Sequence, residues 1–196
     1  MPDRHDRKKV ISGSGSNLQS IIDHIEQEGL PARIQIVVSN NQEAYGLTRA
    51  KNHHIACAVI KHQDYSNRED FDRELIRLLK DAGVDLIVLA GFMRILTASF
   101  LRAFENRIIN IHPALLPAFP GTHVQQKAID YGVKFSGCTV HFVDEGVDTG
   151  PIIIQKAVTW KLTISKIVMP LRCIIRPWTV NRNAKYPEEN NVLCMI

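Results

Sequence analysis

The apolar run at residues 86–90 is the feature that most constrains the fold of this chain. It follows Asp85 and contains no polar residue, so it does not alternate between a core face and a solvent face. A strand of this kind is typical of the centre of a parallel sheet that helices cover on both faces. The sequence therefore predicts an α/β fold built around this strand.

Strand-like and helical patterns alternate on both sides of that run. Such alternation predicts a single doubly wound, mostly parallel sheet with helices on both faces. The short loop between residues 137–143 and 151–158 predicts an antiparallel edge, with 151–158 as the last strand. The other expected strands are 8–12, 34–39, 56–60 and 108–112, and the expected helices are 18–25, 44–51, 66–82, 97–104 and 122–131.

Two polar side chains interrupt the apolar strand at residues 108–112. Asn110 and His112 point to the same face, because side chains two apart in a strand do so, and Pro113 ends the strand. The carboxyl end of a parallel strand is where open α/β sheets bind ligands. An amide can hold an oxyanion there, and an imidazole can transfer a proton. The alternative is that both side chains only bond backbone groups of the loop.

A second strand end, after His141, leads into an acidic loop that ends at Pro151. Its carboxylates would favour the charged form of His112 if the loop folds back toward that residue. Asp148 is the best candidate, since Gly146 and Gly150 on either side allow the backbone to bend sharply.

Near the N-terminus, a turn of glycine and serine at residues 12–17 leads directly into a helical pattern. Free backbone N–H groups and the helix dipole make such a turn a suitable phosphate site. The turn lacks the third glycine of the dinucleotide-binding fingerprint and the GK[ST] of a P-loop. A flexible loop is therefore the alternative.

Four segments resemble one family, in the family's own order. They are GSGSNL at 13–18, AGFMRIL at 90–96, NIHPALLPAFPGTH at 110–123 and HFVDEGVDTGPII at 141–153. The chain resembles the folate-dependent formyltransferases over residues 10–158, and most closely the branch that formylates glycinamide ribonucleotide in purine biosynthesis. The resemblance implies a Rossmann-like fold and a cytoplasmic enzyme without a metal. It also implies transfer of a formyl group from 10-formyltetrahydrofolate to the amine of the ribonucleotide.

The resemblance also implies a role for particular residues. Asn110 and His112 would stabilise the oxyanion, and Asp148 would keep His112 charged and order a water for proton transfer. Without the family, Arg68 would be a solvated surface charge. Residues 91–96 would be either plain core or, because they directly follow a central strand, a loop that lines a ligand site. The implied substrate phosphate and ribose site is Gly13, Ser14, Gly15, Ser16 and Asn17, and the implied folate site is Arg68, Met93, Arg94, Ile95, Leu96, Asn110, Asp144, Glu145, Gly146, Val147 and Asp148.

Composition and residue spacing argue against a membrane, a metal ion or a nucleic acid as a partner, which leaves small molecules. No apolar run has the length of a membrane helix, and the charged first residues do not resemble a secretory signal. The four cysteines have neither zinc nor CxxC spacing, and nothing near His53 and His54 completes a metal site. The net charge of +4 arises in residues 159–196, which lack the interleaved aromatic and basic residues of a single-strand nucleic-acid binder. We expect a monomer or homodimer that binds neither nucleic acid nor membrane.

The chain changes character at Thr159. All 11 glycines precede it, and Pro170, Pro177 and Pro187 interrupt any helical pattern after it, where the resembling family has a long helix. We therefore expect a formyltransferase domain at 1–158 and an atypical, poorly structured tail at 159–196. Our hypothesis is that the tail is translated out of register, which sequencing of the coding DNA after codon 158 would test.

Three other functions remain open. A formyltetrahydrofolate hydrolase would use the same Asn–His–Asp logic with water as the acceptor, but such enzymes carry an additional N-terminal regulatory domain. A methionyl-tRNA formyltransferase would need a further RNA-binding domain. An inactive chain is the third alternative, because the weak first strand and the unusual tail both reduce apolar burial in a marginally stable fold.

Overall fold

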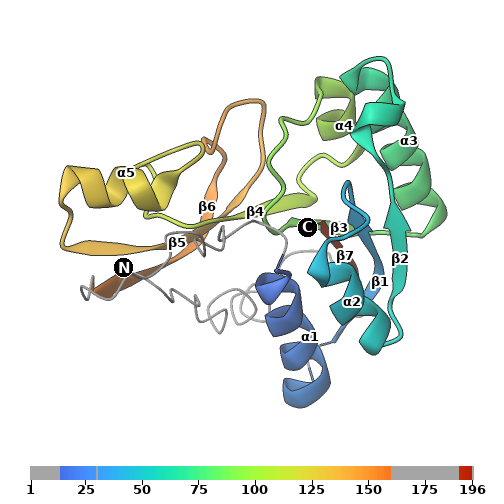
Figure 1. The fold of residues 1–196 in the computed structure, drawn as a ribbon, viewed down its shortest axis with the longest axis horizontal. Helices are drawn as coiled ribbons and strands as arrows, with labels where there is room; N and C mark the ends of the chain where they lie inside the picture. The colour runs from blue at the N-terminus through green and yellow to red at the C-terminus, as the bar shows by residue number, and fades with distance from the viewer. Residues whose placement is uncertain (1–13, 30, 160–189, 196) are drawn as a thin grey trace, which may run out of the picture.

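The computed structural model describes residues 14–29, 31–159 and 190–195, which form one sheet flanked by helices (Figure 1). The strands are β1 (Ala32–Ser39), β2 (Ala56–Val59), β3 (Leu86–Leu89), β4 (Ile108–His112), β5 (Phe135–Phe142), β6 (Ile152–Thr159) and β7 (Asn190–Met195). The helices are α1 (Ser16–Glu28), α2 (Tyr45–Asn52), α3 (Arg68–Asp81), α4 (Ala98–Ala103) and α5 (Val124–Tyr131), with a 3-10 turn at His62–Asp64.

The sheet order within these residues is β2-β1-β7-β3-β4-β5-β6. The first five strands in this order, β2, β1, β7, β3 and β4, run parallel to one another. By contrast, β5 is antiparallel to β4, and β6 is antiparallel to β5. This arrangement confirms the predicted α/β fold with a mostly parallel sheet and an antiparallel edge.

The position of β7 differs from our expectation. Residues 151–158 are not the last strand, because β7 follows them and pairs in parallel with β1 on one side and β3 on the other. Its pairing on both sides satisfies backbone groups of both neighbours, which a local sequence pattern cannot reveal. The poorly structured tail was expected to include these six residues. The rest of the tail, 160–189 and 196, lies outside the described residues, as does the predicted strand at 8–12.

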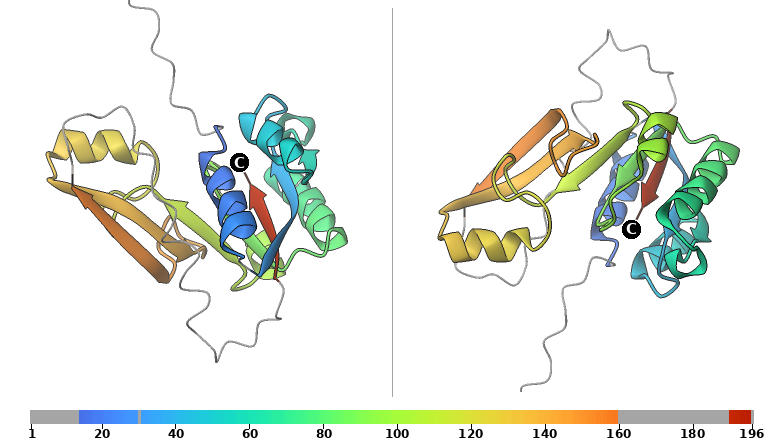
Figure 2. Two further views of the ribbon diagram at one scale, coloured as in Figure 1. Left: turned by 90° about the horizontal axis from the view of Figure 1, so that it is seen from below. Right: turned by 90° about the horizontal axis from the view of Figure 1, so that it is seen from above.

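Each face of the sheet carries its own apolar cluster. Leu86 and Val88 of β3 belong to the cluster with α1 and α2, whereas Ile87 and Leu89 belong to the cluster with α3 and α4. Figure 2 shows α1 and α3 on opposite sides of the sheet. All four residues of β3 are buried, so the prediction from its uninterrupted apolar run is confirmed.

Side-chain caps fix the start of two helices, α3 and α4. The side chain of Asn67 accepts from the backbone N–H of Asp70 at α3, and that of Thr97 accepts from Phe100 at α4. Asn and Thr both favour this position. The caps thus mark where the helix before β3 and the helix after β3 begin.

Candidate active site

A cleft of about 910 Å³ opens where β3 and β4 end. Its walls are the turn before α1, the loop that follows β3, and the loop that follows β5. This is the position at which an open α/β sheet binds ligands, and the sequence predicted it. The predicted residues can therefore be placed relative to one cavity.

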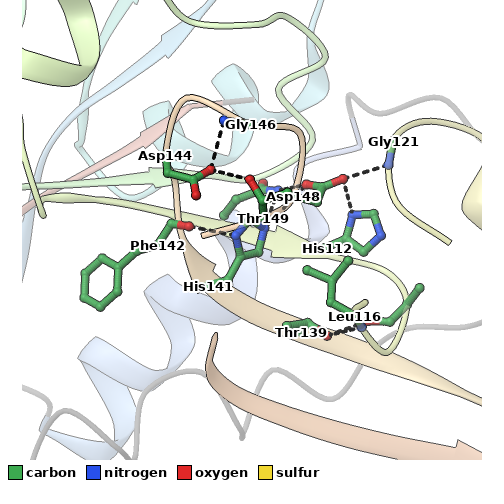
Figure 3. A network of polar contacts seen from close by, with 12 residues as sticks. His112, Leu116, Gly121, Thr139, His141, Phe142, Asp144, Gly146, Asp148 and Thr149 are labelled. Atoms are coloured by element: carbon green, nitrogen blue, oxygen red, sulfur yellow. Dashed lines mark hydrogen bonds and ion pairs between the residues drawn. The ribbon is translucent and has the colours of Figure 1, made fainter. Parts of the chain in front are cut away.

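His112 lies at the end of β4 and is only 3% exposed. Its Nε2 is 2.9 Å from the carbonyl oxygen of Phe119. Its Nδ1 is 3.3 Å from Oδ2 of Asp148, a contact drawn in Figure 3. Both neighbours can only accept hydrogen bonds, so the imidazolium, which has two N–H groups, matches both of them. Both ring nitrogens are therefore engaged, and an imidazolium at this position would act on a developing oxyanion through its positive charge.

Asp148 contacts both of the other predicted catalytic side chains. One carboxylate oxygen, Oδ2, accepts from the N–H of Gly121 at 2.8 Å and faces His112, and the other, Oδ1, accepts from Nδ2 of Asn110 at 3.4 Å. The structure therefore brings the three predicted catalytic side chains together. Their catalytic roles stay a prediction.

The loop that carries Asp148 is bent tightly, as expected. Asp148 itself has φ of 56°, a left-handed conformation that Asp tolerates better than most residues. A Cβ atom at Gly150 would lie 1.9 Å from the carbonyl oxygen of Phe142, so only glycine fits there. Across the loop, Oδ1 of Asp144 accepts from the N–H of Gly146 at 3.1 Å and from Oγ1 of Thr149 at 2.7 Å.

His141 belongs to the same cluster, although it was not among the site residues predicted from the sequence. Its Nε2 lies 3.5 Å from Oδ1 of Asp148 and 3.3 Å from Nδ2 of Asn110, and it is 2% exposed. Its Nδ1 lies 2.8 Å from the carbonyl oxygen of Phe142. Asp148 therefore lies between two imidazoles. The pairing of Asn110 with His141 across β4 and β5 is the signal that would have revealed this contact.

Buried hydrogen bonds hold the loop that presents Phe119 and Gly121 to the site. Oγ1 of Thr139 accepts from the N–H of Leu116 at 3.0 Å and donates to the carbonyl oxygen of Ala114 at 2.7 Å. Nε2 of Gln155 donates to the carbonyl oxygen of Leu116 at 2.8 Å. The antiparallel strands β5 and β6 thus position the partners of His112 and Asp148.

The glycine–serine turn forms another wall of the cleft. Ser14, Ser16 and Asn17 line it, and Gly15 is the left-handed N-cap of α1, whose first turn has neither a side-chain cap nor an acidic residue. Backbone N–H groups at this end of α1 are therefore not bonded by a capping side chain. Gly13, which the sequence also placed here, lies outside the described residues.

The residues expected to bind folate divide into two groups. The loop after β3 contributes Met93 and Ile95, 66% and 61% exposed, which give the cleft an apolar wall. Arg68 and Glu145 are not among the lining residues, and Arg68 is the exposed first residue of α3. The expected folate residues that do line the cleft are Met93, Arg94, Ile95, Leu96, Asn110, Asp144, Gly146, Val147 and Asp148.

Within the part of the chain that the structure describes, no group of three His, Cys, Asp or Glu residues could hold a metal ion. Over the same residues, no helix is long and apolar enough to span a membrane. His53, one of the two histidines considered above, is the C-cap of α2, and its Nδ1 lies 2.8 Å from Oε1 of Glu26.

Comparison with known proteins identifies the family. The formyl transferase domain family matches residues 8–166, a span that includes every predicted site residue. This chain belongs to the formyl transferase family. The matched span also contains all the residues that line the cleft described above.

Relatives of this formyl transferase are enzymes of purine biosynthesis by name. The trifunctional purine biosynthetic protein adenosine-3 of Drosophila melanogaster is 55% identical over 157 residues, which cover 78% of this chain and 12% of that protein. The phosphoribosylglycinamide formyltransferase of Haemophilus influenzae is 47% identical over 149 residues, 76% of this chain and 70% of that protein. The chain thus spans about an eighth of the length of the insect relative.

Solved structures agree with this formyl transferase fold. The crystal structure of glycinamide ribonucleotide transformylase 1 from Symbiobacterium toebii matches with a TM-score of 0.74 and 50% identity. The match covers 76% of this chain and 70% of the other. The predicted resemblance and fold are therefore confirmed.

Proposed function

We propose that this chain transfers a formyl group from 10-formyltetrahydrofolate to the amine of glycinamide ribonucleotide, a step of de novo purine biosynthesis. The convergence of Asn110, His112 and Asp148 in one cleft carries the proposal. The names of the relatives support the choice of acceptor.

The proposed reaction begins with attack of the amine on the formyl carbon. A tetrahedral intermediate forms, and its oxyanion is stabilised by the positive charge of His112 and by the amide of Asn110. The bond from the formyl carbon to the folate nitrogen then breaks. The proton lost by the amine passes to that nitrogen through a water that Asp148 orders. Each step thus uses a side chain of the observed cluster.

The two substrates would occupy opposite parts of the cleft. We place the ribose phosphate at the turn of Gly13, Ser14, Gly15, Ser16 and Asn17, because a helix N-terminus favours an anion. We place the pterin ring between the loop at residues 93–96 and the loop at 144–148, whose residues face the same cavity. The exposed apolar side chains of Met93 and Ile95 suit a flat aromatic ring.

We further propose that the reaction takes place in the cytoplasm, by a monomer or homodimer. Cys57 is a free thiol, which supports a reducing compartment. Sedimentation analysis of the purified chain would decide between one copy and two.

The test is a turnover assay with purified protein, 10-formyltetrahydrofolate and glycinamide ribonucleotide. A reaction without the ribonucleotide and a reaction with the His112→Ala variant serve as controls. Turnover that requires the acceptor and is lost in the variant is the expected result. Formate release without the acceptor would instead indicate a hydrolase, and a folded chain without any turnover would contradict the proposal.

A further inference from the structure

Arg49 of α2 contacts the start of α1 at two points. Its Nε donates to the carbonyl oxygen of Ser14 at 2.9 Å, and its Nη1 donates to Oε1 of Gln19 at 3.0 Å. Ser14 precedes α1 and Gln19 lies in its first turns. One guanidinium thus links the glycine–serine turn to the helix that follows it, and Arg49 itself lines the cleft beside them.

The two helices also touch through their backbones at this place. A Cβ atom on Gly15, which has φ of 63°, would lie 2.5 Å from the Cα atom of Gly46 in α2. No other residue fits this contact without a shift of one helix. The conformation of the turn therefore depends on the position of α2 as well as on the local sequence.

The charge of Arg49 has no carboxylate partner in the described part of the chain. Its contacts are a carbonyl, an amide and the ring of Tyr45, whose centroid is 4.8 Å from Cζ. Two acidic residues of α1 engage other groups, since Asp23 accepts from Nε2 of Gln19 at 2.9 Å and Glu26 pairs with His53. An anion at the turn would thus meet a positive charge that no carboxylate of the described residues neutralises.

We propose that Arg49 is a positioning residue for the phosphate of the acceptor substrate. This inference rests on the proposed function, which places that phosphate at the turn. The planar fork of Arg49 holds the carbonyl of Ser14 and the side chain of Gln19 together, so the N–H groups of the turn stay directed at the anion. Its charge also favours the anion without touching it.

Two variants distinguish the effect of the forked N–H donors of the Arg49 guanidinium from the effect of its charge. Arg49→Gln removes the charge, and Arg49→Lys keeps the charge but loses the fork that reaches two acceptors. Lys51→Gln is the matched control, because Lys51 is exposed, lies on the same helix and does not line the cleft. Thermal unfolding of all three proteins shows whether each one is folded.

The first measurement is the affinity for ribose 5-phosphate by calorimetry, which needs no turnover. We expect both Arg49 variants to bind about tenfold more weakly, the loss typical of a charge-assisted contact, and Lys51→Gln to bind like the unmodified chain. If Arg49→Gln does not fold, Arg49→Lys decides the question. Full affinity in folded Arg49→Lys, or an unmodified chain that does not bind the probe, would overturn the inference.

The second measurement compares glycinamide ribonucleotide with glycinamide riboside, which lacks the phosphate. We expect the loss of kcat/KM in the variants to be confined to the ribonucleotide, whereas general damage to the fold would affect both substrates equally. Phosphate binding that depends on Arg49 without formyl transfer would leave the inference standing and refute the proposed function. Formyl transfer with equal losses of kcat/KM for both substrates would refute the inference and leave the proposed function standing.

Discussion

The carboxylate of Asp148 has the most partners of any side chain in the cleft, since it contacts two imidazoles, an amide and a backbone N–H. Asp148→Asn would keep the size of the side chain and remove the negative charge that lies 3.3 Å from Nδ1 of His112. We expect kcat to fall by about a hundredfold or more, with little change in the melting temperature. Steady-state kinetics on protein whose circular dichroism matches that of the unmodified chain would check this. An unchanged kcat would remove Asp148 from the mechanism.

Asn110 and His112 differ from Asp148 because they would touch the reacting group. Asn110→Ala removes one oxyanion donor and should lower kcat by about a hundredfold or more, and His112→Ala should lower it at least as much. Single-turnover assays with saturating substrates measure the chemical step directly. Full activity in both variants of an otherwise active enzyme is incompatible with oxyanion stabilisation by this pair.

Sequence alone predicted the catalytic trio but not its surroundings. Asn110 and His112 share a face by the period of a strand, and Asp148 follows from glycines that permit a sharp bend. His141, Thr139 and the carbonyl of Phe119 reach the site through strand pairing and a folded loop. Contacts between residues distant in sequence leave no local pattern, which is why these partners were missed.

At the scale of elements, Asp72 connects α3 to the loop that enters α4. It is 3% exposed, and its Oδ2 accepts from the N–H and Oγ1 of Thr97 at 2.8 and 2.7 Å. Asp72→Ala would leave the partly buried N–H of Thr97 without this acceptor and should cost about 1–3 kcal/mol of unfolding free energy. It should also raise the KM for the folate, because residues 93–96 directly precede Thr97.

Denaturant unfolding and separate KM values for the two substrates measure these effects. Asp81→Ala is the control, since its side chain is 64% exposed at the other end of α3 and its ion pair with Arg77 should contribute less than about 1 kcal/mol. Equal destabilisation by both changes would mean that the buried contact has no special role. The two helices were predicted from the sequence, but this link between them was not, because it joins residues 25 apart in the chain.

At the scale of the whole molecule, β7 joins two parts of the sheet that otherwise do not pair. Removal of residues 190–196 would leave β1 and β3 each with an unpaired edge in the middle of the sheet. We expect the shortened chain to lose cooperative unfolding and to aggregate in size-exclusion chromatography. A synthetic peptide of residues 190–196 should restore part of the folded signal. A shortened chain that unfolds like the full one would show that β7 is dispensable.

The sequence predicted the layers of this molecule but not the order of its strands. Apolar runs and alternation define strands and helices, whereas neighbours in a sheet are chosen by packing of the whole chain. The predicted strand at residues 8–12 lies outside the described residues, whereas the place of β7 between β1 and β3 was not predicted. The family match ends at residue 166, before β7 begins. The hypothesis that the tail is translated out of register stays a prediction.

The place of β7 has a consequence for synthesis on the ribosome. Six of the seven described strands emerge before it, but β1 and β3 cannot be joined until residue 195 has left the exit tunnel. Nascent chains with unpaired strand edges are prone to aggregate. During that interval the growing chain would depend on a holding chaperone, and a pause in translation after residue 159 would prolong the exposure.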